Sequence, residues 1–212
     1  MMVTNSNLSG KPNSSDSQDR AEECRRAVET IDAMASDLKR AVQDAASGGE
    51  SFDQMERTIH KTMLQMGYQA MELFVALQGD GDLGESVETE TGKTLRRSKK
   101  PTRSTIRSIF GTHSFEQFTY AAGKNKTIEL RPISARMALP AKQWSFLLQE
   151  FAQMLAVDQA YGQATRNLGQ ILGGTFSVDT AEQVNGDMGE AAGAYLAKLP
   201  VPEPESEAKL LV

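Results

Sequence analysis

Apolar residues recur at helical spacing in two consecutive N-terminal segments, which predicts a pair of amphipathic helices. The first segment, residues 19–46, has one apolar seam, and Ser47-Gly48-Gly49 interrupts the pattern. Ser51 and Gln54 then form a capping-box sequence that opens a second helix, 51–77. The seam comprises Val28, Ile31, Ala35, Leu38 and Val42, and the stripe of the second helix comprises Phe52, Met55, Ile59, Met63, Met66, Ala70, Leu73 and Leu77. Two such helices either pair as a hairpin or associate with another copy of the chain.

The middle of the chain changes to a β-type pattern. Thr91-Gly92-Lys93 separates two short segments that predict a hairpin, and Gly111 separates two longer ones. A last segment alternates apolar and charged residues before Pro132. The segments are 86–90, 94–97, 105–110, 114–121 and 127–131. We therefore predict a small antiparallel sheet that ends at Pro132.

Helical spacing returns after Pro140. The first helix of this part has one apolar face, formed by Trp144, Leu147, Leu148, Phe151 and Leu155. A second helix, 160–172, ends at Gly173-Gly174, and Ser177 or Asp179 begins a third that runs to about Lys198. Two helices joined by a short turn with glycine are typical of a helix-turn-helix. The third helix is acidic and would repel phosphate, so a packing pair is the favoured interpretation.

The predicted fold class is α+β, mostly α. It combines two N-terminal amphipathic helices, a small antiparallel sheet, and a three-helix segment with a helix-turn-helix-like pair. We divide the chain into a disordered tail 1–18, a helical hairpin or coiled-coil region 19–78, a basic β-rich region 79–140, a helical region 141–199, and a Pro/Glu linker with a shortened strand 200–212.

Several classes of protein are disfavoured by composition. No apolar run approaches the roughly 20 residues of a membrane helix, and the first twenty residues contain no apolar stretch typical of a signal peptide. The single cysteine, Cys24, excludes an internal disulfide, and two histidines are too few for a typical zinc site. We expect a soluble cytoplasmic protein.

Charge is distributed unevenly along the chain. The whole chain has a net charge of −5, but residues 91–142 contain twelve Lys or Arg and two Glu, a net charge of +10. A basic block in an acidic chain predicts contact with a polyanion. Its densest part could bind double-stranded DNA through charge and through Ser and Thr hydroxyls. The candidate DNA-binding residues are Arg96, Arg97, Lys99, Lys100, Arg103 and Arg107. The alternative is a solvated loop whose cations pair with the acidic helices.

Other motifs predict no active site. Gly79–Gly84 has the spacing GxGxxG, but it lacks the preceding strand and the following helix of a dinucleotide site. We interpret Cys24 as an incidental thiol, and His60 and His113 as polar surface or edge residues. No catalytic residue and no metal ligand is identified.

Six segments of the chain are distinctive: GDGDLG (79–84), TLRR (94–97), RSIFG (107–111), RPISARMALP (131–140), and the runs 144–163 and 168–185. Taken together, they resemble bacterial insertion-sequence transposases of the ISKra type. The resemblance extends from about Phe52 to Val212. It implies a DDE transposase, in which three carboxylates hold two divalent metals for strand cleavage and joining on an RNase H-like fold.

The resemblance also implies where catalysis would reside. In such transposases the first catalytic aspartate follows a Pro-rich linker and a strand that begins much like Lys209–Val212, where this sequence ends. We therefore expect the N-terminal DNA-binding and assembly region of a transposase, truncated before its core and inactive alone. It would bind double-stranded DNA at the element's ends, and Mg²⁺ would serve only the missing core.

An alternative function is oligomerisation. In this hypothesis residues 19–77 pair with another copy, forming a homo-oligomer or inhibiting a full-length transposase through mixed complexes. A third hypothesis, an unrelated enzyme with an unrecognised site, is disfavoured by the lack of ionisable clusters.

Overall fold

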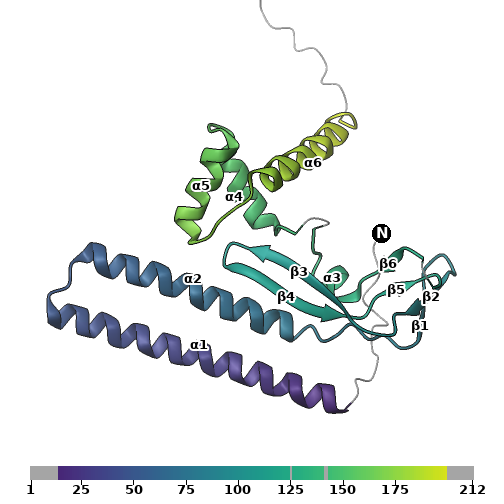
Figure 1. Cartoon of the computed structure of the whole chain (residues 1–212), viewed down its shortest axis with the longest axis horizontal. Coiled ribbons are helices and arrows are strands. Elements are labelled where there is room, and N and C mark those ends of the chain that lie inside the picture. The colour runs from purple at the N-terminus through teal and green to yellow at the C-terminus, as the bar shows by residue number, and fades with distance from the viewer. Residues whose placement is uncertain (1–13, 125, 141–142, 200–212) are drawn as a thin grey trace, which may run out of the picture.

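A computed structural model describes residues 14–124, 126–140 and 143–199. These residues form a hairpin of two long helices, a β-region of two small sheets, and a unit of three shorter helices (Figure 1). The β-region contacts both helical parts. The α+β, mainly helical fold class expected from the sequence is confirmed. Within the described ranges, no helix combines the length and the apolar character needed to cross a bilayer.

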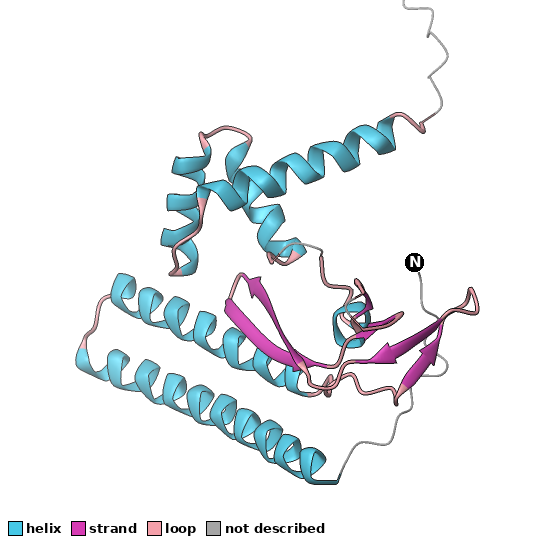
Figure 2. Cartoon of the chain, turned by 45° about the vertical axis from the view of Figure 1, so that its right-hand side comes forward, coloured by secondary structure: helices cyan, strands magenta, loops and turns pink. Residues whose placement is uncertain are grey.

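The two long helices, α1 (Ser14–Gly48) and α2 (Phe52–Ala76), lie side by side in an antiparallel hairpin (Figures 1 and 2). The predicted capping box is present, because Ser51 Oγ accepts the Gln54 N–H and the Gln54 side chain accepts the Ser51 N–H at 3.1 Å. Helix α1 begins inside the segment 1–18 that we expected to be disordered, and the rest of that segment lies outside the described residues.

The helical hairpin buries very little. Ile31, Ala35 and Leu38 of the predicted seam are half-buried, but among the described side chains of α1 and α2 only Val75 is buried. Phe52, at the start of α2, is 84% exposed. The hairpin therefore has no closed core of its own.

The strands form two antiparallel sheets, one in the order β1-β2-β5-β6 and the other β3-β4. The predicted strand 114–121 is divided in two, because Phe118 N–H donates to the Asp80 carbonyl and Thr119 N–H donates to Ser98 Oγ. The strands are β1 (Ser86–Glu88), β2 (Thr94–Arg97), β3 (Thr102–Ser108), β4 (Gly111–Gln117), β5 (Tyr120–Ala121) and β6 (Ile128–Leu130).

The first sheet ends before Pro132, as predicted, but Pro132 then opens a short helix, α3 (Pro132–Arg136), which the sequence pattern did not predict. Proline suits the first helical position because its missing N–H would have no partner there. Gln117 attaches this helix to the end of β4, since its Oε1 accepts the N–H groups of Ile133 and Ser134 at 3.1 and 3.2 Å.

The C-terminal helices α4 (Phe146–Ala156), α5 (Tyr161–Leu172) and α6 (Val178–Leu196) share one core. Ser177 caps α6 by accepting the Thr180 N–H, and Gly173, with a φ of 68°, ends α5 in the left-handed conformation. The buried core residues are Trp144, Leu148, Ala152, Leu168, Ala181 and Val184. The α5–α6 pair thus contributes its inner faces to this core.

Candidate nucleic-acid interface

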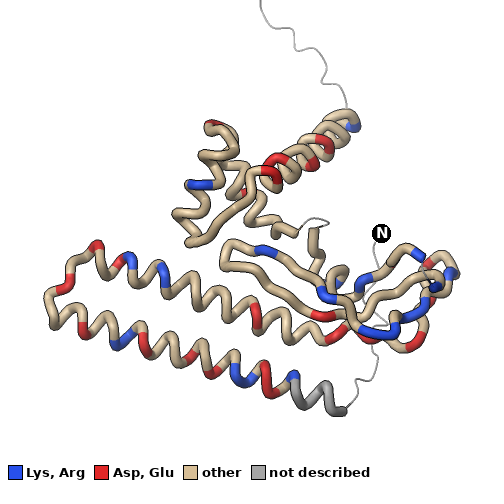
Figure 3. Tube along the Cα trace, viewed as in Figure 1, with Lys and Arg blue, Asp and Glu red and all other residues tan. Residues whose placement is uncertain are grey.

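The connection between the two sheets presents exposed cations. Arg96 lies on β2, Lys99 and Lys100 lie between β2 and β3, and Arg103 follows on β3. All four side chains are exposed. Lys and Arg concentrate around the four-stranded sheet, at the end of the molecule opposite the α1–α2 turn (Figure 3). We call Arg96, Lys99, Lys100 and Arg103 the cationic turn.

Strand alternation determines the orientation of Arg96. Leu95 pairs with Val87 and is only 1% exposed, so this side of β2 faces the interior. Arg96 pairs with Ser86 and with Ala121, on the opposite face of the sheet. Its guanidinium is therefore presented to solvent.

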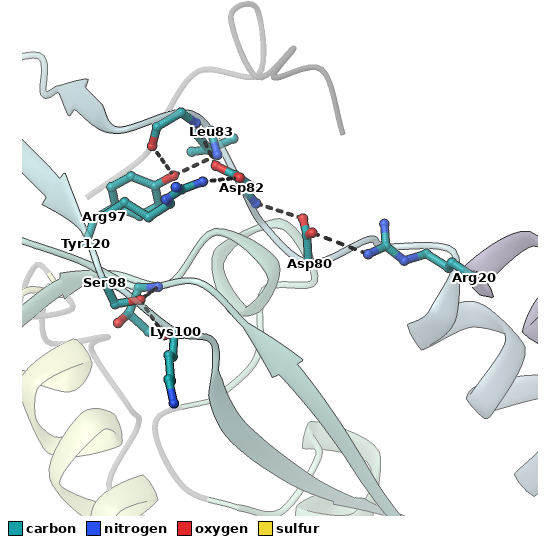
Figure 4. A network of polar contacts seen from close by, with 10 residues as sticks. Arg20, Asp80, Asp82, Leu83, Arg97, Ser98, Lys100 and Tyr120 are labelled. Carbon is teal, nitrogen blue, oxygen red and sulfur yellow. Dashed lines mark hydrogen bonds and ion pairs between the residues drawn. The ribbon is translucent and has the colours of Figure 1, made fainter. Parts of the chain in front are cut away.

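Ser98 holds the backbone between the two sheets. Its hydroxyl donates to the Lys100 carbonyl at 2.8 Å and accepts the Thr119 N–H at 3.2 Å. The Ser98 N–H in turn donates to the Thr119 carbonyl at 2.7 Å. The Lys100 side chain extends away from these contacts (Figure 4). The backbone of the cationic turn is thus anchored while its charged groups remain free to contact a ligand.

The cationic turn is not neutralised by the acidic helices. In the described part of the chain, none of its four cations has a carboxylate within ion-pair distance. Arg103 is the least favourable member, because it pairs in register with Glu116 and both line a cavity of about 660 Å³ together with Glu72. The nearby Lys93 is neutralised by Glu129 at 2.6 Å, on a strand rather than on α1 or α2.

The other two candidate residues make contacts inside the fold. Arg97 forms an ion pair with Asp82 and lies over the Phe118 ring, 4.8 Å from its centroid. Arg107 lies 4.0 Å from the centroid of Phe176, and burial lowers the pKa of its guanidinium. Arg97 thus joins the sheet to the preceding loop and Arg107 joins β3 to the helical unit, so we exclude both from the cationic turn.

Three further cations lie beside the same sheet. Lys124 and Lys126 occupy the connection between β5 and β6, and Arg131 follows β6. All three are exposed. They belong to the basic block but lie outside its densest segment. The sheet order places β6 two strands from β2, with β5 between them.

The GxGxxG segment, 79–84, forms a compact structural loop. Asp80 and Asp82 each accept the backbone N–H two residues ahead, at 3.0 and 2.9 Å, and Asp80 also pairs with Arg20 of α1 at 3.4 Å. The Tyr120 hydroxyl accepts one backbone N–H of the loop at 2.7 Å and donates to a carbonyl at 3.0 Å (Figure 4). Tyr120 is fully buried, which raises its pKa. The carboxylates and glycines of this segment therefore shape the chain.

The sequence interpretation of His113 as a surface or edge residue is wrong, because His113 is fully buried between α2 and the β3–β4 hairpin. Its Nδ1 lies 2.6 Å from Glu72 Oε1, and its Nε2 lies 2.9 Å from Ser108 Oγ. Tyr68 stacks on the ring, with the centroids 5.0 Å apart. An ionised carboxylate only accepts hydrogen bonds, so Nδ1 donates to an ionised Glu72, and Nε2 of a neutral imidazole then accepts from Ser108.

The Glu72–His113–Ser108 contacts repeat the order of groups in an acid–base–nucleophile triad. Ser108 is only 7% exposed, however, and its Oγ also accepts the Phe110 N–H at 3.1 Å. A substrate has no open approach to such a hydroxyl. We therefore assign the contacts a structural role, in which His113 connects α2 to both strands of the β3–β4 hairpin.

Comparisons with known proteins provide no additional constraint. No family model, curated protein or solved structure matches this chain. The geometry and charge of the cationic turn are therefore the basis of the proposed function.

Proposed function

We propose that this chain binds double-stranded DNA through the cationic turn. The observation that supports the proposal is four exposed cations within eight residues, none of them ion-paired in the described part of the chain. Such groups attract phosphates and release the counterions condensed on the duplex. Contacts of this type position a protein on DNA and carry little sequence information.

We further propose that the chain is the DNA-binding and assembly region of an insertion-sequence transposase, acting at the ends of the element. This part of the proposal is supported by the six segments that resemble such transposases. No residue of this chain is assigned to strand cleavage. Binding through the cationic turn requires no metal.

The α5–α6 pair is a weaker candidate for the DNA contact. The exposed surface of α6 includes Asp179, Glu182 and Glu190, whose charges repel phosphate. Its inner residues Ala181 and Val184 are buried in the helical core. We therefore place the contact on the β-region rather than on this helix pair.

Salt-titrated binding to labelled duplex DNA tests the proposal. Four phosphate contacts predict a slope of about −3.6 for log K against log salt concentration. Replacing all four residues of the cationic turn with Ala should weaken binding to every duplex and make the slope much shallower. Unchanged affinity of this variant at low salt would refute the assignment.

A matched control separates the cationic turn from overall charge. Lys39, Lys61, Arg166 and Lys198 are exposed cations elsewhere in the chain, and replacing them with Ala removes the same number of charges. This variant should retain the wild-type slope, and an equal loss of binding would contradict the proposed interface. Tighter binding to the element's ends than to a random duplex supports the transposase role, and equal affinity contradicts it.

A further inference from the structure

Helix α2 carries a continuous apolar stripe on its exposed side. At 100° per residue, nine apolar positions, Leu73 among them, fall within a sector of roughly 100° that extends along the whole helix. We call all of them except Leu73, the half-buried neighbour of Phe74, the α2 stripe: Phe52, Met55, Ile59, Met63, Met66, Ala70, Phe74 and Leu77. The exposed fractions of its five most accessible large side chains are 84% for Phe52, 37% for Ile59, 53% for Met63, 47% for Phe74 and 64% for Leu77.

The opposite side of α2 is already occupied. Tyr68 and Glu72 lie about half a turn away from the stripe and contact His113 of the β3–β4 hairpin. Gly67 lies between these two sides and is in close contact with the Phe110 ring. This side of α2 thus packs against the β3–β4 hairpin, and the α2 stripe faces outward.

The exposed area is large enough to require an explanation. The five side chains leave on the order of 500 Å² of apolar surface in water, whereas each partner of a standard protein interface contributes about 800 Å². The rims of the two helices can supply the remainder of such an interface. A continuous patch of this size marks an interaction site.

The spacing of the stripe is compatible with pairing to its own antiparallel copy. With Leu73 left out, the intervals from Phe52 to Leu77 are 3-4-4-3-4-4-3, which read the same in both directions. A two-fold axis between residues 64 and 65 therefore superimposes the stripe on itself in an antiparallel pair. A second copy of the chain fits this symmetry and also supplies apolar surface for the α1–α2 hairpin, in which Val75 is the only buried residue among the described side chains.

We propose that the α2 stripe is covered by the α2 stripe of a second copy of this chain, packed antiparallel. The axis places Phe52 level with the partner's Leu77, and Ile59 level with the partner's Ala70. Ile59, which is branched, thus lies opposite the small Ala70 of the second copy. Met63 lies level with Met66 of the second copy. Two hairpins joined in this way form a four-helix assembly that completes the core missing from each hairpin.

Sedimentation equilibrium of the full chain, without nucleic acid, tests this proposal. The wild type should form a dimer. Phe52→Glu combined with Met63→Glu should raise the dimer dissociation constant at least about tenfold, because two exposed anchors become charged. Both residues are already exposed, so far-UV circular dichroism should remain unchanged when it is recorded at a protein concentration at which both proteins are dimeric. Val157, which is 78% exposed on the C-cap of α4, provides the control Val157→Glu, which should still dimerise.

A wild type that remains monomeric at high micromolar concentration would overturn the proposal, as would a double variant that dimerises as tightly as the wild type. Loss of dimerisation in the Val157→Glu control would overturn the assignment to α2. These outcomes do not depend on DNA binding, so either proposal can fail without the other.

The antiparallel orientation has its own measurement. A nitroxide label is attached to Glu50→Cys in a Cys24→Ser background, since Cys24 is the only native cysteine. In the antiparallel pair the two labels lie at opposite ends of the helices, about 40 Å apart. A parallel pair brings them to within about 20 Å, and this result in pulsed dipolar spectroscopy would overturn the proposed arrangement.

Discussion

The contact between Glu72 and His113 provides a quantitative test of how α2 is joined to the β-region. Glu72→Ala removes the acceptor of His113 Nδ1, at 2.6 Å, while the histidine remains fully buried. An unsatisfied buried donor costs about 1–3 kcal/mol. The Glu72 side chain is 36% exposed and lines a cavity that can admit water, which favours the lower half of this range. We therefore expect the free energy of unfolding to fall by about 1–2 kcal/mol.

Urea unfolding, followed by circular dichroism at one fixed protein concentration, measures this loss. Glu72→Gln keeps an oxygen that can accept from Nδ1 and should lose less than about 1 kcal/mol. Glu56→Ala, at an exposed position of the same helix, should change stability by no more than about 0.5 kcal/mol. The reasoning is refuted if Glu72→Ala and Glu56→Ala are equally stable. Ser108→Ala should couple to Glu72→Ala in a double-mutant cycle, because His113 connects the two residues.

Two further predictions concern glycine and tyrosine. A Cβ on Gly67 would lie 2.3–2.9 Å from ring atoms of Phe110, so Gly67→Ala should lower the unfolding midpoint despite its higher helix propensity. Gly189→Ala, with nothing within 4 Å of its Cβ, should raise stability by up to about 1 kcal/mol, and an equal gain at both positions would contradict the close packing of Gly67. Burial raises the pKa of Tyr120, so the folded state keeps the phenol proton at pH values where the unfolded state releases it. This stabilisation is complete below the unfolded pKa of about 10 and is lost as the pH rises through the folded value. The urea midpoint should therefore fall between about pH 8 and about pH 10.5, and Tyr120→Phe should show a smaller fall; an equal fall in both proteins would show that Tyr120 is not responsible.

The helices could be predicted from the sequence because their signals are local. Apolar spacing and caps such as Ser51 with Gln54 define α2, and Gly173 and Ser177 mark the α5–α6 turn. Helix α3 was missed because five residues are too few to show a period. The division of the segment 114–121 into two strands depends on hydrogen bonds to distant parts of the chain, which no local pattern records.

The candidate site was predictable only in part, for the same reason. Strand alternation orients Arg96 outward, and the density of cations between β2 and β3 is visible in the sequence. The structural roles of Arg97 and His113, in contrast, depend on partners 15 and 41 residues earlier in the chain. Arg107 likewise has its aromatic partner, Phe176, in the helical unit that contacts β3, 69 residues further along the chain.

The open core of the α1–α2 hairpin has a thermodynamic consequence. Val75 is the only buried side chain among those described in the two helices, so an isolated hairpin has little apolar burial to offset the entropy of ordering it. In the proposed two-fold pair, that burial is gained on association, and folding becomes subject to mass action. Each tenfold dilution then lowers the stability of the pair by about 1.4 kcal/mol, so the abundance of the protein in the cell would itself regulate how much of the hairpin is folded.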